Sequence, residues 1–138
     1  MIVDASVVLS AFFPDESQPR AQALIRDHAV GRVRLVAPTL LLYEVTNALV
    51  QAQRRGRISA AQAGEILSSF EGLGIELRSV SGQQMLALAE RFERSAYDAA
   101  YLALAESTGQ PLVTADLRLY RAVHEHLSSV QWLGDYTV

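Results

Sequence analysis

The sequence predicts a three-layer α/β domain built around a mainly parallel central sheet. Short β-branched or apolar segments alternate with longer segments of helical periodicity, the pattern of strands joined by crossover helices. Half of the 138 residues are hydrophobic, which is enough for one packed core. No repeat, low-complexity stretch or linker divides the sequence. We therefore expect residues 1–138 to form a single domain.

The chain is expected to open with a short strand followed by two helices. Ile2–Asp4 begins with two β-branched residues, which favour a buried strand. Helical periodicity over Ala5–Phe13 ends at Pro14, since proline cannot continue a helix. A proline in the first turn and a glycine after the last turn bound a second helix, Pro19–Val30, which ends at Gly31.

The second strand is expected to lead into two long helices. Leu35–Ala37 is an apolar run short enough for a buried strand. Proline is favoured in a first helical turn, so Pro38 is expected to open a helix that reaches about Arg55, just before a glycine. Ser59 is a favourable N-cap for the next helix, which we expect to end at one of the glycines in residues 72–74.

The third strand is expected to precede a helix that is buried on all sides. Ile75–Val80 alternates apolar and polar residues, as a half-buried strand does. Ser81 caps a helix that runs to about Phe92, and another helix covers Tyr97–Ser107. Ala99–Ala105 has no polar face, so this part of the helix is expected to lie inside the domain.

The last part of the chain supplies two more strands and one helix. Leu112–Thr114 follows Gly109 and Pro111 and reads as a buried strand. A helix is expected over Leu117–Val123, and Val130–Leu133 reads as a final strand at the edge of the sheet.

Composition excludes several kinds of chemistry. All 12 basic residues are arginine, and the chain has no cysteine. This excludes Schiff-base lysines, a Walker A loop, cysteine nucleophiles, thiolate zinc sites and disulfides. Receiver domains and aspartate-nucleophile phosphatases normally use a lysine beside the phosphoryl group, so they are disfavoured too. The net charge of −3 and the pI near 5.6 give no overall attraction to nucleic acid.

No targeting or membrane segment is expected. The N-terminus lacks a basic region followed by a long apolar stretch, as a signal peptide would have. The longest apolar run, Ala99–Ala105, is far shorter than the roughly 20 residues that a bilayer requires. We therefore expect a cytoplasmic protein that makes no contact with membranes.

Four acidic residues occupy positions that favour a functional site. In an open α/β sheet, ligands bind beyond the carboxyl ends of the strands, and Asp4 and Asp116 each follow a predicted strand. Asp98 begins the buried helix, and Glu44 lies inside a helix among apolar neighbours. Helix capping alone explains any one of the three aspartates. Glu44 has no cap to make, so it is either turned to the surface or buried with a partner.

The arginines leave these acids without local counter-charges. Arginine stands at positions 20, 26, 32, 34, 54, 55, 57, 78, 91, 94, 118 and 121. The stretches 1–19, 35–53 and 95–117 therefore lack lysine and arginine, and all four acids lie in them. The one arginine that closely follows any of the four acids is Arg118, two residues after Asp116. Clustered carboxylates repel by roughly 4 kcal/mol per pair at 4 Å. A hard divalent cation, Mg²⁺ or Mn²⁺, is the natural compensator for an all-oxygen site.

Acid–base catalysis by histidines is disfavoured. It requires histidines placed to transfer protons at the site. His28, His124 and His126 are distant in sequence from the four acids and are expected to be ordinary surface residues. We therefore expect attack by water that a carboxylate-held metal ion activates.

Four sequence motifs, in order, resemble those of PIN-domain ribonucleases of the VapC toxin type. They are Met1–Ser6, Glu44–Leu49, Tyr97–Ala105 and Pro111–Asp116. The resemblance covers essentially the whole chain. It implies a PIN-like α/β/α sandwich, a Mg²⁺- or Mn²⁺-dependent endoribonuclease that leaves a 5′-phosphate and a 3′-hydroxyl, a cognate antitoxin protein, and a homodimer.

The resemblance also implies roles for individual residues. It assigns metal-binding and catalytic roles to four carboxylates, namely Asp4, Glu44, Asp98 and Asp116. Ser6 and Thr114 are then polar supporting residues, and Asn47 faces the site one turn after Glu44. Many relatives carry a further acid shortly after the last aspartate, whereas Leu117, Arg118, Leu119 and Tyr120 follow here. The number of metal ions, one or two, is thus left open.

RNA requires positive contacts outside the acidic pocket. Arg54, Arg55 and Arg57 are candidates, together with a second group, Arg20, Arg26, Arg32 and Arg34. The alternative is that arginines simply favour the end of a helix. Likewise Tyr43, Tyr97 and Tyr101 are either base-stacking residues or, more commonly, core or interface residues. An alternative function is a PIN-like binding or RNA-processing domain without a toxin role, whose acidic pocket docks a partner's arginine.

Overall fold

A computed structural model describes residues 1–137 of the chain. These residues form one five-stranded sheet in the order β3-β2-β1-β4-β5, and every pair of neighbouring strands is parallel. The strands are β1 (Ile2–Val3), β2 (Val36–Pro38), β3 (Glu76–Arg78), β4 (Leu112–Thr114) and β5 (Val130–Trp132). The predicted parallel sheet is confirmed, and the last strand lies at an edge as expected.

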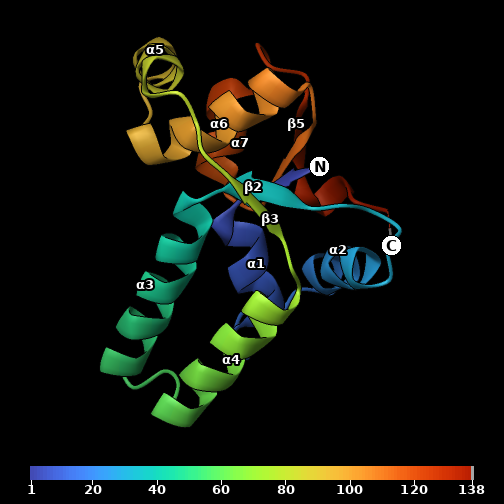
Figure 1. Cartoon of the computed structure of the whole chain (residues 1–138), viewed down its shortest axis with the longest axis vertical. Helices are drawn as coiled ribbons and strands as arrows, with labels where there is room; N and C mark the ends of the chain where they lie inside the picture. The colour runs from blue at the N-terminus through green and yellow to red at the C-terminus, as the bar shows by residue number, and fades with distance from the viewer. Residues whose placement is uncertain (138) are drawn as a thin grey trace.

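Helices cover both faces of this sheet, as Figure 1 shows, which gives the predicted three layers. On one face lie α1 (Ala5–Phe12), α2 (Pro19–Ala29), α3 (Leu40–Arg54) and α4 (Ala60–Gly72). On the other face lie α5 (Gly82–Phe92), α6 (Ala96–Thr108) and α7 (Leu117–Val123). A 3₁₀ helix, Leu133–Asp135, follows β5. No helix within residues 1–137 is long and apolar enough to cross a bilayer.

The strands separate two hydrophobic cores. Successive side chains of a strand point to opposite faces, so Ile2 packs into the core beneath α5–α7 and Val3 into the core beneath α1–α4. Leu112 and Val113 of β4 divide between the same two cores. Ala99–Ala105 of α6 is buried throughout, as its sequence predicts. Packing against helices on both faces therefore fixes the carboxyl ends of β1 and β4.

The predicted start of the third helix was wrong by two residues. Pro38 does not open the helix but ends β2, where it pairs with Arg78 of β3, and α3 begins at Leu40. The N–H of Thr39 donates to the carbonyl of Arg78 over 3.0 Å, which keeps this segment in the sheet. Likewise Leu133 belongs to the 3₁₀ helix rather than to β5.

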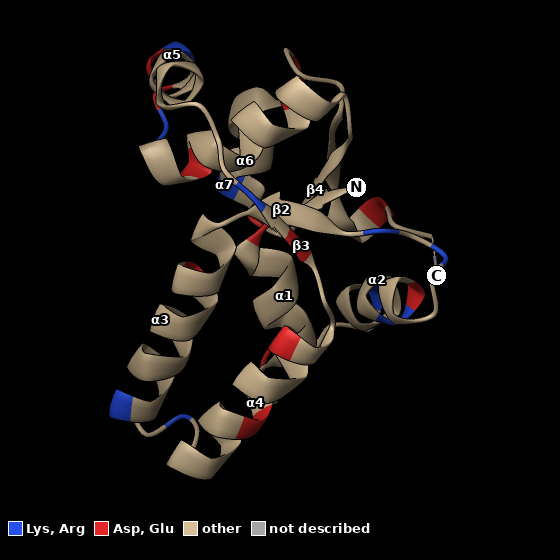
Figure 2. Cartoon of the chain, viewed as in Figure 1, with Lys and Arg blue, Asp and Glu red and all other residues tan. Residues whose placement is uncertain are grey.

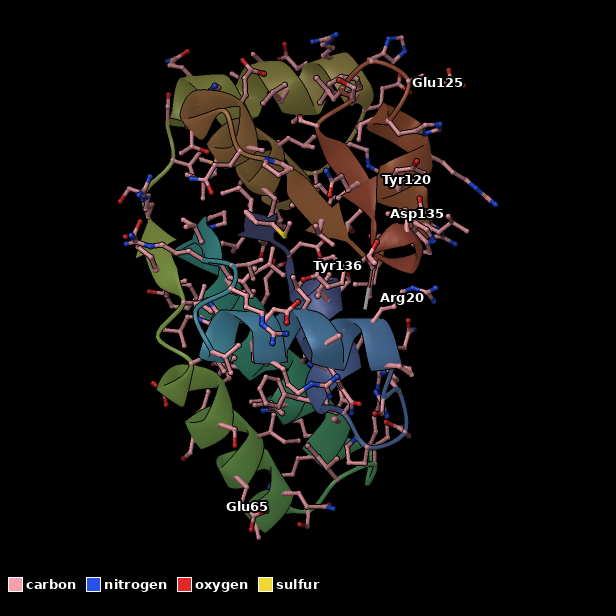
Figure 3. All side chains as sticks on the ribbon, turned by 90° about the vertical axis from the view of Figure 1, so that its right-hand side faces the viewer. Arg20, Glu65, Tyr120, Glu125, Asp135 and Tyr136 are labelled. Atoms are coloured by element: carbon pink, nitrogen blue, oxygen red, sulfur yellow. The ribbon has the colours of Figure 1, made fainter. Side chains whose placement is uncertain are left out.

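Two predicted helix caps are confirmed, and a segment near the C-terminus contacts α2. Ser59 and Gln62 form a reciprocal capping box at the start of α4, and the Ser81 hydroxyl accepts from the backbone of α5. Figure 3 shows Arg20 of α2 beside Tyr136, whose carbonyl accepts a 3.2 Å hydrogen bond from Arg20 Nε. The Tyr136 hydroxyl also donates to Asp27 of α2.

Candidate active site

Asp4 lies at the carboxyl end of β1 and is the most buried of the four acids. Its side chain is 5% exposed and caps α1 by accepting from the N–H of Val7. The hydroxyls of Ser6 and Thr114 each donate to one of its two carboxylate oxygens over 2.5 Å. Burial raises the pKa of Asp4 to about 6, with a smaller contribution from the charge of Asp116, although these hydrogen bonds oppose the rise.

Asp116 lies at the carboxyl end of β4 and is joined to Asp4 through one side chain. Its carboxylate caps α7 by accepting from the N–H groups of Arg118 and Leu119. The Thr114 hydroxyl, which donates to Asp4, accepts from the N–H of Asp116 over 3.0 Å. Thr114 therefore fixes both aspartates. The capping prediction is confirmed for Asp4 and Asp116, and for both it coexists with a position at the strand ends.

Asp98 lies in the first turn of α6 but is not its cap. The Ser95 hydroxyl takes that role by accepting from the N–H of Asp98. The carboxylate instead accepts a 3.3 Å hydrogen bond from Nε of Arg94. Burial raises the pKa of Asp98, Arg94 opposes this rise, and Asp116 adds to it. Arg94 is thus the basic partner of Asp98, although it lies one residue outside the stretch 95–117 that lacks basic side chains. No ion pair among residues 1–137 involves Arg118.

Glu44 lies on α3 and is half-buried with a partner. The hydroxyl of Tyr101 on α6 donates to its Oε1 over 2.5 Å. Burial raises the pKa of Glu44, and the charge of Asp98 adds to the rise while the tyrosine hydrogen bond opposes it. Tyr101 is itself 3% exposed, so it is a core residue rather than a platform for bases. Asn47 lies exposed on α3, three residues after Glu44.

The four acids form a series of electrostatic pairs. The charges of Asp4 and Asp116, of Asp98 and Asp116, and of Glu44 and Asp98 each interact. Within residues 1–137, no three acidic or histidine side chains lie close enough together to hold one ion directly. The donors are all oxygen, and burial destabilises the charge on three of them. This donor set suits a hard divalent cation that reaches some ligands through water.

The arginines predicted to contact RNA lie away from the acids. Figure 2 shows basic residues at the end of α3 and in the connection to α4, away from the sheet. Arg54 is ten residues beyond Glu44 on one helix, which is about 15 Å along its axis. Arg57 pairs with both oxygens of Asp15 and with Glu16. In the second group, Arg20, Arg32 and Arg34 contact Tyr136, Asp27 and Glu76 respectively.

The expectation for one histidine was wrong. His28 is partly buried, and its Nδ1 accepts from the N–H of Leu35 over 3.0 Å. Its Nε2 lies 2.7 Å from the carbonyl oxygen of Leu73, so the ring carries its proton on Nε2 and joins three segments. His124 stacks on Tyr120 of α7 and takes no part in the acidic cluster.

An apolar hollow of about 440 Å³ lies between the first turns of α3 and α6 and the segments that follow β2 and β3. Two exposed tyrosines line it: Tyr43, next to Glu44, is 69% exposed, and Tyr97, next to Asp98, is 64% exposed. Leu40 of α3 also lines the hollow.

Comparison with known proteins identifies the family. The PIN-domain family model matches residues 1–125. The chain is 36% identical over 119 residues to VapC ribonuclease Mb0985 of Mycobacterium bovis, covering 86% of this chain and 87% of that protein. It is 32% identical over 124 residues to ribonuclease VapC3 of Pyrobaculum aerophilum, covering 86% and 91%.

Solved structures agree with this assignment. The crystal structure of PAE2754 from Pyrobaculum aerophilum superposes with a TM-score of 0.73 at 25% identity, over 96% of this chain and 90% of that one. A toxin–antitoxin complex from Klebsiella pneumoniae contains a chain with the same fold, at a TM-score of 0.63 and 15% identity over 94% of each chain. Together with the match over residues 1–125, these likenesses establish that the chain belongs to the PIN-domain family.

Proposed function

We propose that this chain is a Mg²⁺- or Mn²⁺-dependent endoribonuclease, the toxin of a toxin–antitoxin pair, which hydrolyses RNA phosphodiester bonds in the cytoplasm. The observation that carries the proposal is the assembly of Asp4, Glu44, Asp98 and Asp116 from four separate segments into one series of interacting charges. Relatives named VapC ribonuclease, at 32–36% identity over most of the chain, support the same activity.

The four acids are the proposed metal-binding and catalytic residues. When held by these acids, a divalent cation would supply a water molecule of lowered pKa and positive charge for the scissile phosphate. Asp4 is held rigidly by the Ser6 and Thr114 hydroxyls, so its two oxygens keep a fixed direction. Such hydrogen bonds around ligands typically change metal affinity by 10–100-fold when removed.

Each of the other acids has a contact that sets its orientation. Asp116 is fixed by the first turn of α7, whose two N–H groups it accepts. Glu44 is aimed by Tyr101, and Asp98 by Arg94, each through a single hydrogen bond. In each of these two carboxylates the second oxygen has no protein donor among the described residues, which leaves one oxygen available to a cation or to a water molecule.

RNA cleavage by the purified chain tests the proposal. We expect cleavage with Mg²⁺ or Mn²⁺ that stops in EDTA, and a loss of at least 100-fold in Asp98→Asn. The matched control is Glu65→Gln, an exposed acid on α4 (Figure 3), which should cleave as the parent does. Cleavage that persists in EDTA would contradict the metal mechanism. If expression is toxic and the toxicity persists in Asp4→Asn, the activity does not depend on this site.

A second copy of the chain is the proposed occupant of the apolar hollow lined by Tyr43 and Tyr97. Homodimerisation would cover the exposed Tyr43 and Tyr97, which otherwise present apolar surface to water. We expect light scattering after gel filtration to give twice the monomer mass for the parent and a lower mass for Tyr43→Ser. Val30→Ser, at an exposed apolar position at the end of α2, is the control and should leave the mass unchanged.

An antitoxin partner is proposed because the chain is similar to ribonucleases named VapC and shares its fold with a chain of a toxin–antitoxin complex. A short reading frame beside this gene should encode a protein that copurifies with the chain and suppresses its RNA cleavage. A chain that binds RNA but cleaves none under any of these conditions would instead favour a binding role.

A further inference from the structure

The acidic cluster contains a cation of its own, Arg94. Its Nε donates to Oδ2 of Asp98 over 3.3 Å, and its side chain is 26% exposed. Within residues 1–137, neither terminal amino group of Arg94 has a hydrogen-bond acceptor or an acidic partner. The guanidinium therefore keeps two N–H₂ groups unused beside carboxylates that repel phosphate.

The backbone around Arg94 holds it in this place. Glu93 ends α5 in the left-handed conformation, with φ of 52°, which a residue with a side chain adopts infrequently. The N–H of Arg94 then donates to the carbonyl of Ala89 over 3.0 Å, and Ser95 caps α6 immediately afterwards. Helix α5 thus passes into α6 through a short turn fixed at both ends, and this turn places Arg94 just before α6, four residues ahead of Asp98.

We propose that Arg94 binds a phosphate of the RNA, an inference that rests on the proposed ribonuclease function. Guanidinium groups bind phosphate oxygens through two parallel N–H donors, and the unused amino groups of Arg94 offer this fork. The contact through Nε orients the fork relative to Asp98. The phosphate that reaches it lies at the border of the metal-binding carboxylates, so Arg94 sets where the RNA backbone enters the site.

Arg54 and Arg57, two of the arginines expected to contact RNA, do not offer this contact. Arg54 lies about 15 Å away from Glu44 along α3. Arg57 is engaged by two acids and lies over the ring of Phe13. An arginine that served only to neutralise Asp98 would bind best with two parallel donors, whereas Arg94 uses one.

RNA binding as a function of salt concentration tests this role. The experiment uses the full chain with Asp116→Asn, which prevents cleavage and keeps a favourable helix cap, and a fluorescent single-stranded RNA in Mg²⁺. Log K falls as log salt rises, and each phosphate contact to a single strand adds about 0.7 to the steepness of this fall. We expect Arg94→Gln to make the fall less steep by about 0.7 and to weaken binding about 10-fold at low salt.

Two further variants separate charge from geometry. Arg94→Lys keeps the charge but loses the planar fork, so it should keep the slope and still bind more weakly than Arg94. Arg91→Gln removes the same charge from an exposed position on α5, where the arginine lies over the ring of Phe92, and should leave the slope and affinity within twofold of the parent. Equal melting temperatures would show that all variants fold.

An unchanged slope in Arg94→Gln, in a protein that binds RNA, would overturn the role of Arg94 and leave the ribonuclease proposal standing. The same holds if Arg94→Gln alters only the Mg²⁺ affinity measured by calorimetry, since Arg94 would then act solely as a counter-ion of Asp98. A parent chain that neither binds nor cleaves RNA would overturn both proposals.

Discussion

The hydroxyl of Tyr101 donates to Oε1 of Glu44 over 2.5 Å, between residues 57 positions apart in sequence. This hydrogen bond joins α6 to α3 and hence two of the motifs that carry the candidate site. Burial and the glutamate raise the pKa of Tyr101 far above its ordinary value, so the hydroxyl is protonated and donates at neutral pH. Glu44 thereby keeps one defined orientation inside an apolar helix face.

Replacing Tyr101 with phenylalanine should change both the metal affinity and the pH profile. The hydrogen bond lowers the pKa of Glu44, so Tyr101→Phe should raise it and move the acidic limb of the cleavage profile to higher pH. Loss of the orienting hydroxyl should weaken Mg²⁺ binding about 10-fold. Calorimetry and cleavage from pH 5 to 9 measure the two effects. Tyr136→Phe, which removes a similar bond to Asp27, is the control and should change neither.

Thr114 should be essential for the shape of the site. Thr114→Val keeps the volume but leaves the N–H of Asp116 and one oxygen of Asp4 without a partner at a fully buried position. We expect a loss of about 1–3 kcal/mol in the free energy of unfolding and a marked fall in cleavage. Thr108→Val removes a hydroxyl that only contacts a helix carbonyl near the end of α6, and it should be nearly neutral. Equal stability of the two variants would contradict this interpretation.

The order of strands and helices and the positions of the acids could be predicted from the sequence, because both depend on residues that are close together in the chain. Short apolar runs and helical periodicity mark the parallel sheet, and acids within two residues of a strand end, such as Asp4 and Asp116, lie at the same end of neighbouring parallel strands. Ser59 and Ser81 mark helix starts because capping requires only nearby backbone groups.

Features that depend on one turn or on distant backbone were not predictable. Arg94 reaches Asp98 because Glu93 adopts a left-handed conformation, for which no glycine gives a signal. Pro38 remains in the sheet because β3, forty residues later in the chain, pairs with it. The partial burial of His28 could not be predicted, because its two hydrogen-bond partners are main-chain groups of Leu35 and Leu73, which leave no signal in the sequence.

His28 should therefore be important for stability and not for catalysis. His28→Ala removes the acceptor for the N–H of Leu35 and a contact to Leu73, 45 residues away. We expect the free energy of unfolding to fall by about 1–3 kcal/mol, measured by urea denaturation, with unchanged cleavage per folded molecule. The matched control is His126→Ala, an exposed position that should change stability by less than about 0.5 kcal/mol. A loss of cleavage without a loss of stability would contradict this role.

Asp4 should make the metal-free protein less stable as the pH rises. Burial raises its pKa from 3.8 to about 6, so between these values the folded chain holds a proton that the unfolded chain has released. The folded state is then favoured at low pH, and this advantage is lost as the pH rises through about 6. A shift of this size corresponds to about 3 kcal/mol, so above pH 6 the buried charge weighs fully against folding.

Asp4→Asn removes that charge, and its amide can still pair with the Ser6 and Thr114 hydroxyls, which both donate and accept. In EDTA at pH 7.5 the variant should melt at a higher temperature than the parent, and the difference should shrink towards pH 4.5, where Asp4 is already protonated. Mg²⁺ should raise the melting temperature of the parent and leave that of the variant unchanged, because a cation compensates the same charge. A variant that is less stable than the parent in EDTA at pH 7.5 would show that the buried carboxylate is already compensated within the protein, and that the cluster does not require a metal ion.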